Sequence, residues 1–302
     1  MKNLGVILLK GILKLFAAIP LRAAYAMSGV LEFLLKSVVR YRRDVVMANL
    51  ARCFPEKRYN ELSNICNEFY KHFTELLVET IWFGGCDKER FQKSNIVQVT
   101  NIECAQTLIE NSPSVMVMFA HTGNWEIIGG LEAFNLENGE NTFNSKNTTV
   151  VYRELSNKAW NEVMKANRFA PVDKKDYESC YIESKNIMRF VVRNRDKKRF
   201  YFLNTDQRPY FKGSDNIKVN FMGQECRSMS GAAALAHKLN MAVCYMSMKR
   251  ERRGHYSIEF IPICEDASKM EIQAIMDKYY SLVEADIRQE PENYLWSHKR
   301  WQ

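Results

Sequence analysis

The sequence predicts an α/β fold in which a mixed, mostly parallel sheet is flanked by helices. From about residue 96 onward, short runs rich in β-branched and aromatic residues alternate with longer segments of helical periodicity. Residues Val115–Phe119 form an apolar run with the length and character of a buried strand. A late hairpin, formed by 241–248 and 256–261 around Gly254, adds an antiparallel pair to this pattern.

The composition is that of a globular, basic protein. Hydrophobic residues make up 46% of the 302 residues and aromatic residues 12%, so the chain can bury a full core as one large domain with an added terminal element. The net charge of +8 favours anionic partners, namely nucleic acid, an anionic membrane, or an acidic carrier or substrate. Eight cysteines without a C-x-x-C pair indicate a reduced, cytoplasm-facing protein, and five histidines without zinc-ligand spacing predict no metal.

Residues 1–43 form an apolar and basic N-terminal element. Charges and Pro20 interrupt its apolar residues, and the longest uncharged run, Ala23–Leu31, is shorter than the ~20 residues of a simple transmembrane helix. We therefore expect two helices that lie in or dip into a bilayer surface, with Lys and Arg side chains reaching the head groups. The alternative is a helix pair packed on the protein's own core. The basic run Arg40–Arg43 follows, and it suits an anionic cytoplasmic leaflet.

Periodicity and boundary residues define the remaining elements in order. The segment 59–83 has one broad apolar helical face and stops at Gly84-Gly85, and Asn101 can cap a helix that ends before Pro113. Beyond that point, β-rich runs predict strands and amphipathic runs predict helices. We expect helices at 59–83, 102–111, 125–134, 157–167, 184–195, 229–239 and 270–288, and strands at 96–99, 115–119, 148–152, 200–203, 217–221, 241–248 and 256–261.

The stretch His121-Thr-Gly-Asn-Trp-Glu126 directly follows the buried strand. Gly123 permits a sharp turn, and Asn124 is a good N-cap for the next helix. Two residues five apart within one α-helix are about 140° apart around its axis, so His121 and Glu126 can meet only if the histidine precedes the helix. The sequence therefore predicts a His121–Glu126 dyad at a helix N-terminus, where a general base can act and a developing negative charge is stabilised. A structural pair without a chemical role is the alternative.

Two further polar residues follow predicted strands. Arg153 comes directly after strand 148–152, and Asp206 comes shortly after strand 200–203. Ligands bind at the carboxyl ends of strands in open α/β sheets, so His121, Arg153 and Asp206 would converge at one edge if their strands are neighbours. A structural ion pair between loops would explain Arg153 and Asp206 equally well.

The sequence also argues against several chemistries. It contains no G-x-S-x-G elbow, no Walker motif and no dinucleotide-binding glycine motif, so the corresponding hydrolase and nucleotide sites are not expected. A His–Glu dyad without a covalent nucleophile suits direct transfer. His121 would take a proton from an incoming hydroxyl or amine, and that group would attack an acyl carbonyl. Arg153 or main-chain N–H groups would stabilise the oxyanion.

The same residues resemble a known family. The pentad His121–Glu126 resembles the H-x-x-x-x-D/E motif of glycerolipid acyltransferases. In its H-x-G-N-W-E form it resembles the late lipid A acyltransferases, the lauroyl and myristoyl transferases that act on Kdo-lipid IVA. Further segments resemble family motifs in the same order along the chain, and the similarity covers essentially its whole length. These segments are Arg43–Leu50 with Phe54-Pro55, Tyr152-Arg153, Asp206-Gln207, Phe221–Gly223 and Pro291–Trp301.

The resemblance implies a glycerolipid acyltransferase-like domain at 44–302, preceded by membrane-associating helices at 1–43. It implies a membrane-associated O-acyltransferase on the cytoplasmic side of the bacterial inner membrane. Such an enzyme moves a fatty acyl chain from acyl carrier protein, or from acyl-CoA, to a hydroxyl of a lipid A precursor, without a cofactor. His121 and Glu126 would be the catalytic dyad. Arg153, Asp206 and Asn124 would support it, and the anionic acceptor or acidic carrier would contact Arg40, Arg42, Arg43, Gln207 and Arg250.

Other functions stay open at the level of sequence. The same chemistry could act on an aminolipid, a glycolipid, a lysophospholipid or a pigment precursor, and the same dyad could activate water in a lipid-ester hydrolase. A non-catalytic basic module would expose aromatic residues among its basic ones, whereas the aromatic residues here lie mostly in apolar runs. Nucleic acid is therefore not an expected partner. No motif specifies the acyl chain length, the acceptor or the oligomeric state.

Overall fold

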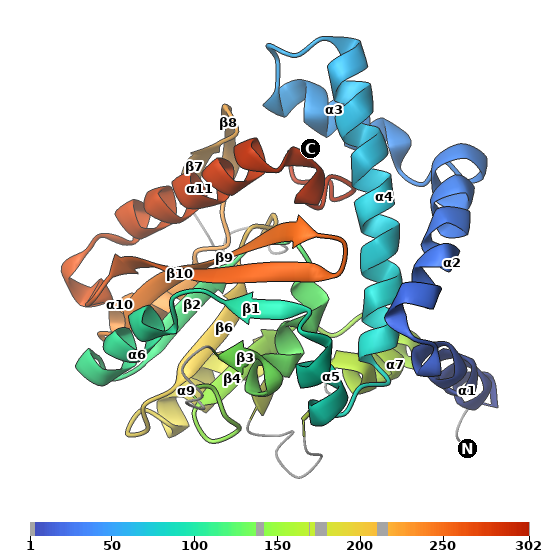
Figure 1. Ribbon diagram of the computed structural model, residues 1–302. Helices are drawn as coiled ribbons and strands as arrows, with labels where there is room; N and C mark the ends of the chain where they lie inside the picture. The colour runs from blue at the N-terminus through green and yellow to red at the C-terminus, as the bar shows by residue number, and fades with distance from the viewer. Residues whose placement is uncertain (1–3, 137–141, 169, 173–179, 210–216, 302) are drawn as a thin grey trace.

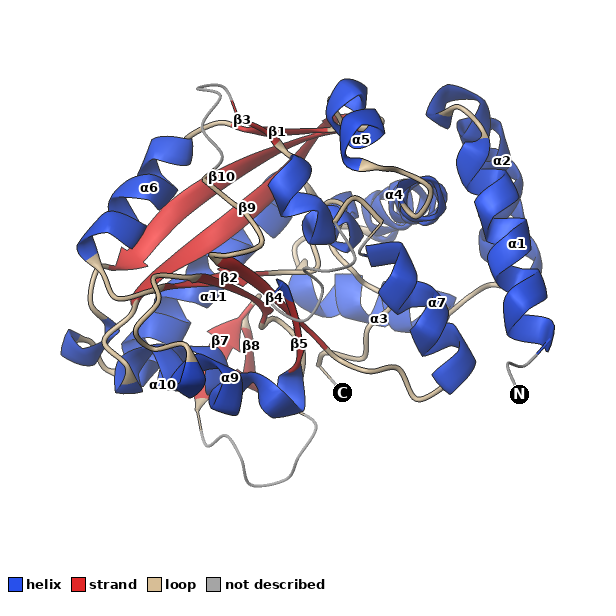
Figure 2. Ribbon diagram, turned by 90° about the horizontal axis from the view of Figure 1, so that it is seen from below, coloured by secondary structure: helices blue, strands red, loops and turns tan. Residues whose placement is uncertain are grey.

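The computed structural model describes residues 4–136, 142–168, 170–172, 180–209 and 217–301. Its centre is an eight-stranded sheet with the strand order β3-β1-β10-β9-β2-β6-β4-β5 (Figures 1 and 2). Within the described residues, all strand pairings of this sheet are parallel except the one between β9 and β10. The α/β class, the mostly parallel sheet and the late antiparallel hairpin are therefore confirmed.

The strands follow the predicted runs closely where those runs are long. The main sheet contains β1 (Val97–Val99), β2 (Val115–Phe119), β3 (Asn135–Leu136), β4 (Thr148–Tyr152), β5 (Tyr181–Glu183), β6 (Phe200–Asn204), β9 (Ala242–Arg252) and β10 (His255–Cys264). A separate antiparallel pair consists of β7 (Lys218–Phe221) and β8 (Gln224–Arg227).

Helices occupy both sides of the sheet. They are α1 (Leu4–Ala18), α2 (Leu21–Phe33), the π-helix η1 (Leu34–Val38), α3 (Arg43–Cys53), α4 (Tyr59–Phe83), α5 (Lys88–Ser94), α6 (Ile102–Asn111), α7 (Lys158–Arg168), α9 (Ile187–Arg193), α10 (Gly231–Lys238) and α11 (Ile272–Gln289). Short 3-10 helices are η2 (Trp125–Ala133), η4 (Ser184–Asn186), η5 (Ala267–Lys269) and η6 (Pro291–Asn293).

Two cores lie on opposite faces of the sheet. In β2, Met116 and Met118 enter the core that contains residues of α10 and α11, whereas Val115, Val117 and Phe119 enter the core that contains residues of α5 and α6. All five residues are buried. A strand covered on both faces has no solvent side to alternate with, and this explains the uninterrupted apolar run.

The N-terminal helices α1 and α2 pack against α4 at the side of the molecule (Figures 1 and 2). Thirteen large hydrophobic side chains are exposed in the described part of the chain, and nine of them lie between residues 8 and 39. We call these nine the N-terminal apolar surface: Leu8, Ile12, Leu15, Phe16, Val30, Phe33, Leu34, Val38 and Val39. In the described ranges, no helix is both long enough and apolar enough to cross a membrane.

Several elements differ from the sequence-based expectation. The run after Asn124 is a 3-10 helix rather than an α-helix, and the Asn124 side chain makes no capping bond. The strand expected at 217–221 pairs with β8 and lies outside the main sheet. Both β3 and β5 were missed because strands of two or three residues are too short to show periodicity.

Gly129 allows η2 to pack against the end of α7. A Cβ at this position would lie 1.9 Å from the backbone oxygen of Arg168 and 2.0 Å from the hydroxyl of Tyr181. We expect Gly129→Ala to lower the free energy of unfolding by about 3 kcal/mol, which calorimetry would register as a melting temperature roughly 5–10 °C lower. Gly231→Ala is the matched control, because a Cβ there meets nothing within 4 Å. Equal melting temperatures for the two variants would contradict this packing.

Candidate active site

Two neighbouring strands place His121 beside Asp206. β2 and β6 pair in parallel with Phe119 opposite Asn204, and each polar residue follows two positions later. Continuing this register sets His121 opposite Asp206 at the carboxyl ends of the strands. β4 pairs with the other side of β6, so Arg153 follows its strand at the same edge. The structure thus brings the ends of these three strands together.

Hydrogen bonds fix both ring nitrogens of His121. Its Nδ1 lies 2.7 Å from Asp206 Oδ1, and its backbone N–H donates to Asp206 Oδ2 over 3.3 Å. An ionised carboxylate only accepts hydrogen bonds, so Nδ1 carries the proton and Nε2 keeps its lone pair. The amide nitrogen of Gln207 lies 3.0 Å from His121 Nε2 and can donate to it. This tautomer is the one that a general base requires.

Asp206 is buried, being 1% exposed, and its surroundings favour the ionised form. Burial alone would raise the pKa of its carboxyl, but the imidazole and the N–H of His121, together with Arg300, hold the pKa below its usual value. Arg300 Nε also donates to the main-chain oxygen of Asp206 over 2.6 Å. The carboxylate therefore both orients the imidazole and stabilises a positive charge on it.

Glu126 lies in the first turn of η2, where Arg168 holds it. Arg168 ends α7 and donates to both carboxylate oxygens, over 2.6 Å from Nε and over 2.8 Å from Nη2. Burial would raise the pKa of Glu126, but Arg168 and then the nearby His121 bring it below its usual value. Glu126 is thus an ionised carboxylate near His121, while the hydrogen bond described for His121 Nδ1 goes to Asp206.

The C-terminal segment holds the turn that follows His121. The N–H of Gly123 donates to the Asn293 oxygen over 3.2 Å, and the N–H of Leu295 donates to the His121 oxygen over 3.1 Å. Gly123 has a φ of 58°, in the left-handed region that favours glycine, and a Cβ there would lie 2.8 Å from Met248. The glycine is therefore required both by the backbone conformation and by the close approach of β9.

A comparison with protein families identifies the family of this chain. A family model described as bacterial lipid A biosynthesis acyltransferase matches residues 1–302. This chain belongs to that family. It is therefore an acyltransferase of lipid A biosynthesis, and the expected acyltransferase activity is confirmed at this level. A search of curated proteins found no match.

Two residues predicted to support the acyltransferase's chemistry lie in different surroundings. Asn124 is fully buried, and its Nδ2 donates to Glu79 of α4 over 2.7 Å. Arg153 is exposed where β4 ends. The role of either residue at an oxyanion stays a prediction.

The basic residues predicted to contact carrier or acceptor also differ from one another. Arg40 and Arg42 are exposed and Arg43 is partly exposed. Arg42 Nη1 donates to the main-chain oxygen of Ser297 over 2.9 Å. Arg250 forms an ion pair with the buried Glu75, which gives it a structural role. Their contacts with a substrate stay predictions.

Three residues of the candidate site were not found from the sequence. Glu79 lies one turn after Glu75 in a predicted helix, and two acids repeated at this spacing are a detectable signal. Arg300 lies within the closing motif that carries the family resemblance. Arg168 is one basic residue at the end of an amphipathic helix, and no sequence feature distinguishes it from a solvated one. Within the described ranges, no group of three or more His, Cys, Asp or Glu side chains could hold a metal ion.

The His121–Asp206 pair leads to a direct test. In Asp206→Asn the new amide can donate to Nδ1, which would move the ring proton to Nε2 and remove the base. We expect kcat for acyl transfer to fall about 100-fold or more with little change in KM, as measured on the purified enzyme. Asp196→Asn is the matched control, since Asp196 is exposed before the opposite end of β6. A wild-type kcat for Asp206→Asn would show that His121 does not depend on this carboxylate.

Proposed function

We propose that this acyltransferase moves a fatty acyl chain from the thioester of acyl carrier protein to a hydroxyl of a lipid A precursor by direct transfer. The His121–Asp206 pair, with the Nε2 lone pair at the carboxyl edge of the sheet, carries the proposal. His121 accepts the proton of the hydroxyl as its oxygen attacks the thioester carbonyl. The C–S bond then breaks, and the imidazolium returns the proton to the leaving thiolate. The acceptor oxygen is itself the nucleophile, so no acyl-enzyme forms.

The charges around His121 support this sequence of proton transfers. Asp206 and Glu126 both stabilise the imidazolium, and Arg168 keeps Glu126 ionised and in place. The acceptor hydroxyl replaces the Gln207 amide on Nε2. Arg153 or main-chain N–H groups stabilise the oxyanion at the thioester carbon.

Basic side chains near this edge support an acidic carrier and an anionic lipid acceptor. β9 runs parallel to β2 with Met246 opposite Phe119, so its last residues, including the exposed Arg252, extend beyond the same edge. Arg199, by contrast, precedes β6 at the other end of the sheet. It is buried and donates to Thr149 and to main-chain oxygens, which gives it a structural role. Nucleic acid is not a proposed partner.

The N-terminal apolar surface supports a location on the cytoplasmic face of the bacterial inner membrane. A concentration of exposed large apolar side chains in one segment is typical of contact with a membrane or a partner. Lys10, Lys14 and Arg22 lie on the same two helices and suit anionic head groups. We propose that α1 and α2 lie in the bilayer surface and place the catalytic edge near the lipid acceptor.

Membrane contact through this surface is testable by substitution. We expect Leu15→Glu with Phe33→Glu to move most of the protein from the membrane to the soluble fraction, because each change exposes a charge in place of a side chain whose burial stabilises by about 1.5–3 kcal/mol. Flotation with vesicles of anionic lipids would measure the shift. Val192→Glu alters an exposed apolar residue on α9 and should float like wild type. Unchanged flotation of the double variant would contradict the membrane assignment.

Lipid analysis tests the reaction itself. In cells that lack the gene, mass spectrometry should show lipid A without one acyl chain, and the wild-type gene should restore it. We expect His121→Ala to restore none, because loss of a general base costs about 10²–10⁴ in rate. His255→Ala, a change at a hairpin histidine, should restore the chain.

The outcomes of this experiment separate the alternatives. If cells that lack the gene lose an acyl chain from another lipid, the proposed chemistry holds and the acceptor is that lipid. In a purified assay, free fatty acid in place of acylated lipid would indicate a hydrolase, and transfer from acyl-CoA alone would exclude the carrier as donor. Restoration by His121→Ala would refute the role of this histidine.

A further inference from the structure

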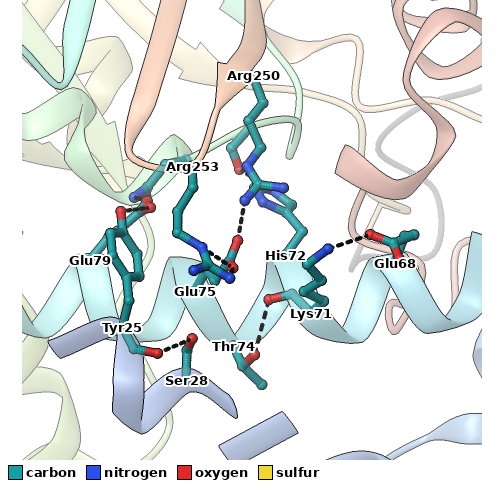
Figure 3. Close-up of polar contacts among 12 residues, drawn as sticks. Tyr25, Ser28, Glu68, Lys71, His72, Thr74, Glu75, Glu79, Arg250 and Arg253 are labelled. Atoms are coloured by element: carbon teal, nitrogen blue, oxygen red, sulfur yellow. Dashed lines mark hydrogen bonds and ion pairs between the residues drawn. The ribbon is translucent and has the colours of Figure 1, made fainter. Parts of the chain in front are cut away.

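A polar stripe runs along a buried face of α4. His72, Glu75 and Glu79 are spaced three and four residues apart, which puts them on one side of the helix, and each is at most 2% exposed. Figure 3 shows the stripe facing the tip of the β9–β10 hairpin, where Arg250 and Arg253 both bond to Glu75. A charge on a buried helix face is destabilising unless it is paired. The partners of these three side chains therefore indicate which parts of the fold the stripe holds together.

Glu79 joins three separate elements. Its Oε1 accepts the hydroxyl of Tyr25 from α2 over 2.6 Å. Its Oε2 accepts the hydroxyl of Tyr256 from β10 and the Nδ2 of Asn124, each over 2.7 Å. All three partners donate and both oxygens are satisfied. Burial raises the pKa of Glu79 above its usual value, and these three hydrogen bonds oppose that shift by favouring the carboxylate.

These contacts hold the catalytic turn, by which we mean residues 121–126. The Asn124 side chain is bonded to Glu79, and the Gly123 oxygen lies 3.3 Å from His72 Nε2. Burial lowers the pKa of His72 to about 3, so its ring is neutral at physiological pH and can donate from Nε2 to this oxygen. Two adjacent residues of the catalytic turn, Gly123 and Asn124, are therefore each hydrogen-bonded to a side chain of α4.

Tyr25 brings the N-terminal helices into the same network. The Arg253 guanidinium lies over the Tyr25 ring, 5.2 Å from its centre. Gly254 has a φ of 70°, and a Cβ there would lie 2.4 Å from the Tyr25 hydroxyl oxygen, so the absent side chain lets this hydroxyl reach Glu79. Two hydrogen bonds, from Tyr25 and from Asn124 to the same carboxylate, thus connect α2 to the catalytic turn.

We propose that Glu79 is a positioning residue for acyl transfer, and that Tyr25 makes the catalytic turn depend on the seating of α2 against α4. Because α2 carries part of the N-terminal apolar surface, bilayer contact favours the seated helix and thereby the working position of His121. This second step rests on the proposed function, which supplies the membrane. The connection between Tyr25 and the turn is internal to the chain.

Tyr25→Phe in the purified full-length enzyme removes one hydroxyl and little volume. We expect kcat to fall about tenfold, while KM for donor and acceptor stays within about twofold, because the hydroxyl acts on the position of the turn. Ser28→Ala is the matched control. It removes a hydroxyl on the same helix, which donates to the main-chain oxygen of Tyr25 over 2.8 Å (Figure 3). It should keep wild-type kcat. Glu79→Gln should lower kcat at least as much, and adding Tyr25→Phe to it should change kcat by less than about twofold.

Hydrogen–deuterium exchange provides a readout that does not need activity. In Tyr25→Phe the amides of the catalytic turn should exchange about tenfold faster, while those of the β9 segment 242–248 keep the wild-type rate. Ser28→Ala should leave both rates unchanged. Vesicles of anionic lipids should slow exchange of the turn in wild type and leave it unchanged in Tyr25→Phe.

Four results would overturn the proposal. Two are kinetic: a wild-type kcat in Tyr25→Phe, or a full additional loss of kcat when Tyr25→Phe is added to Glu79→Gln. Two concern exchange in Tyr25→Phe: turn amides that exchange at the wild-type rate, or faster exchange throughout the sheet, which would indicate general destabilisation. An unaltered exchange rate of the wild-type turn on vesicles would overturn the membrane step. A wild-type enzyme that transfers no chain from a carrier thioester would contradict the proposed function instead, and the exchange measurement on Tyr25→Phe would still decide whether Tyr25 holds the turn.

Discussion

A carboxylate removed from water has to be paired, and four such carboxylates surround the catalytic turn. Each has its own partners: two arginines of the hairpin for Glu75, two tyrosines and an amide for Glu79, Arg168 for Glu126, and His121 for Asp206. Leaving one of these charges unpaired would cost several kcal/mol, so the pairs fix where α4, α7, the hairpin and β6 lie around the turn. The tautomer of His121 follows from the same constraint, because Asp206 sets which ring nitrogen carries the proton.

The sheet supplies the accuracy that these pairs need. β2 is packed on both faces, with its odd and even residues in different cores, so a slip of one residue would exchange the two sets. The pairing of Phe119 with Asn204 is therefore strongly specified, and it carries His121 to Asp206 two residues later. Main-chain contacts add to this fixation. Tyr279 donates its hydroxyl to the Phe119 oxygen over 2.9 Å at the end of β2.

Much of this arrangement could be predicted from the sequence. The apolar run Val115–Phe119 identified the central strand, and polar residues after predicted strands identified His121, Arg153 and Asp206 as an edge cluster. The partner of Nδ1 was not predicted, because it depends on the register between β2 and β6, which are about 80 residues apart in the chain and have no pairing signal in a single sequence. Local reasoning favoured Glu126 because it is near in sequence.

The remaining misses have similar causes. Glu79 lies within the predicted helix 59–83 but was not predicted to have a role, since the donors that justify a buried acid come from three distant segments. η2 was expected to be an α-helix from its apolar residues. Gly129 and Gly130 weaken helix propensity there, and the backbone of Arg168 leaves no room for a side chain at Gly129. The glycines that permit close packing next to the site thus also weaken the α-helix.

Segments from both the N-terminal and the C-terminal parts of the described chain hold the turn 121–126. From the N-terminal side, Tyr25 reaches Glu79 and through it Asn124, and from the C-terminal side Asn293 and Leu295 bond to the backbone of Gly123 and His121. Contacts between such distant segments require their connecting loops to close, so the geometry of the turn depends on long-range contacts. The position of His121 therefore depends on contacts from distant parts of the chain. The proposed influence of α2, on the outer side of α4, would reach His121 through these contacts.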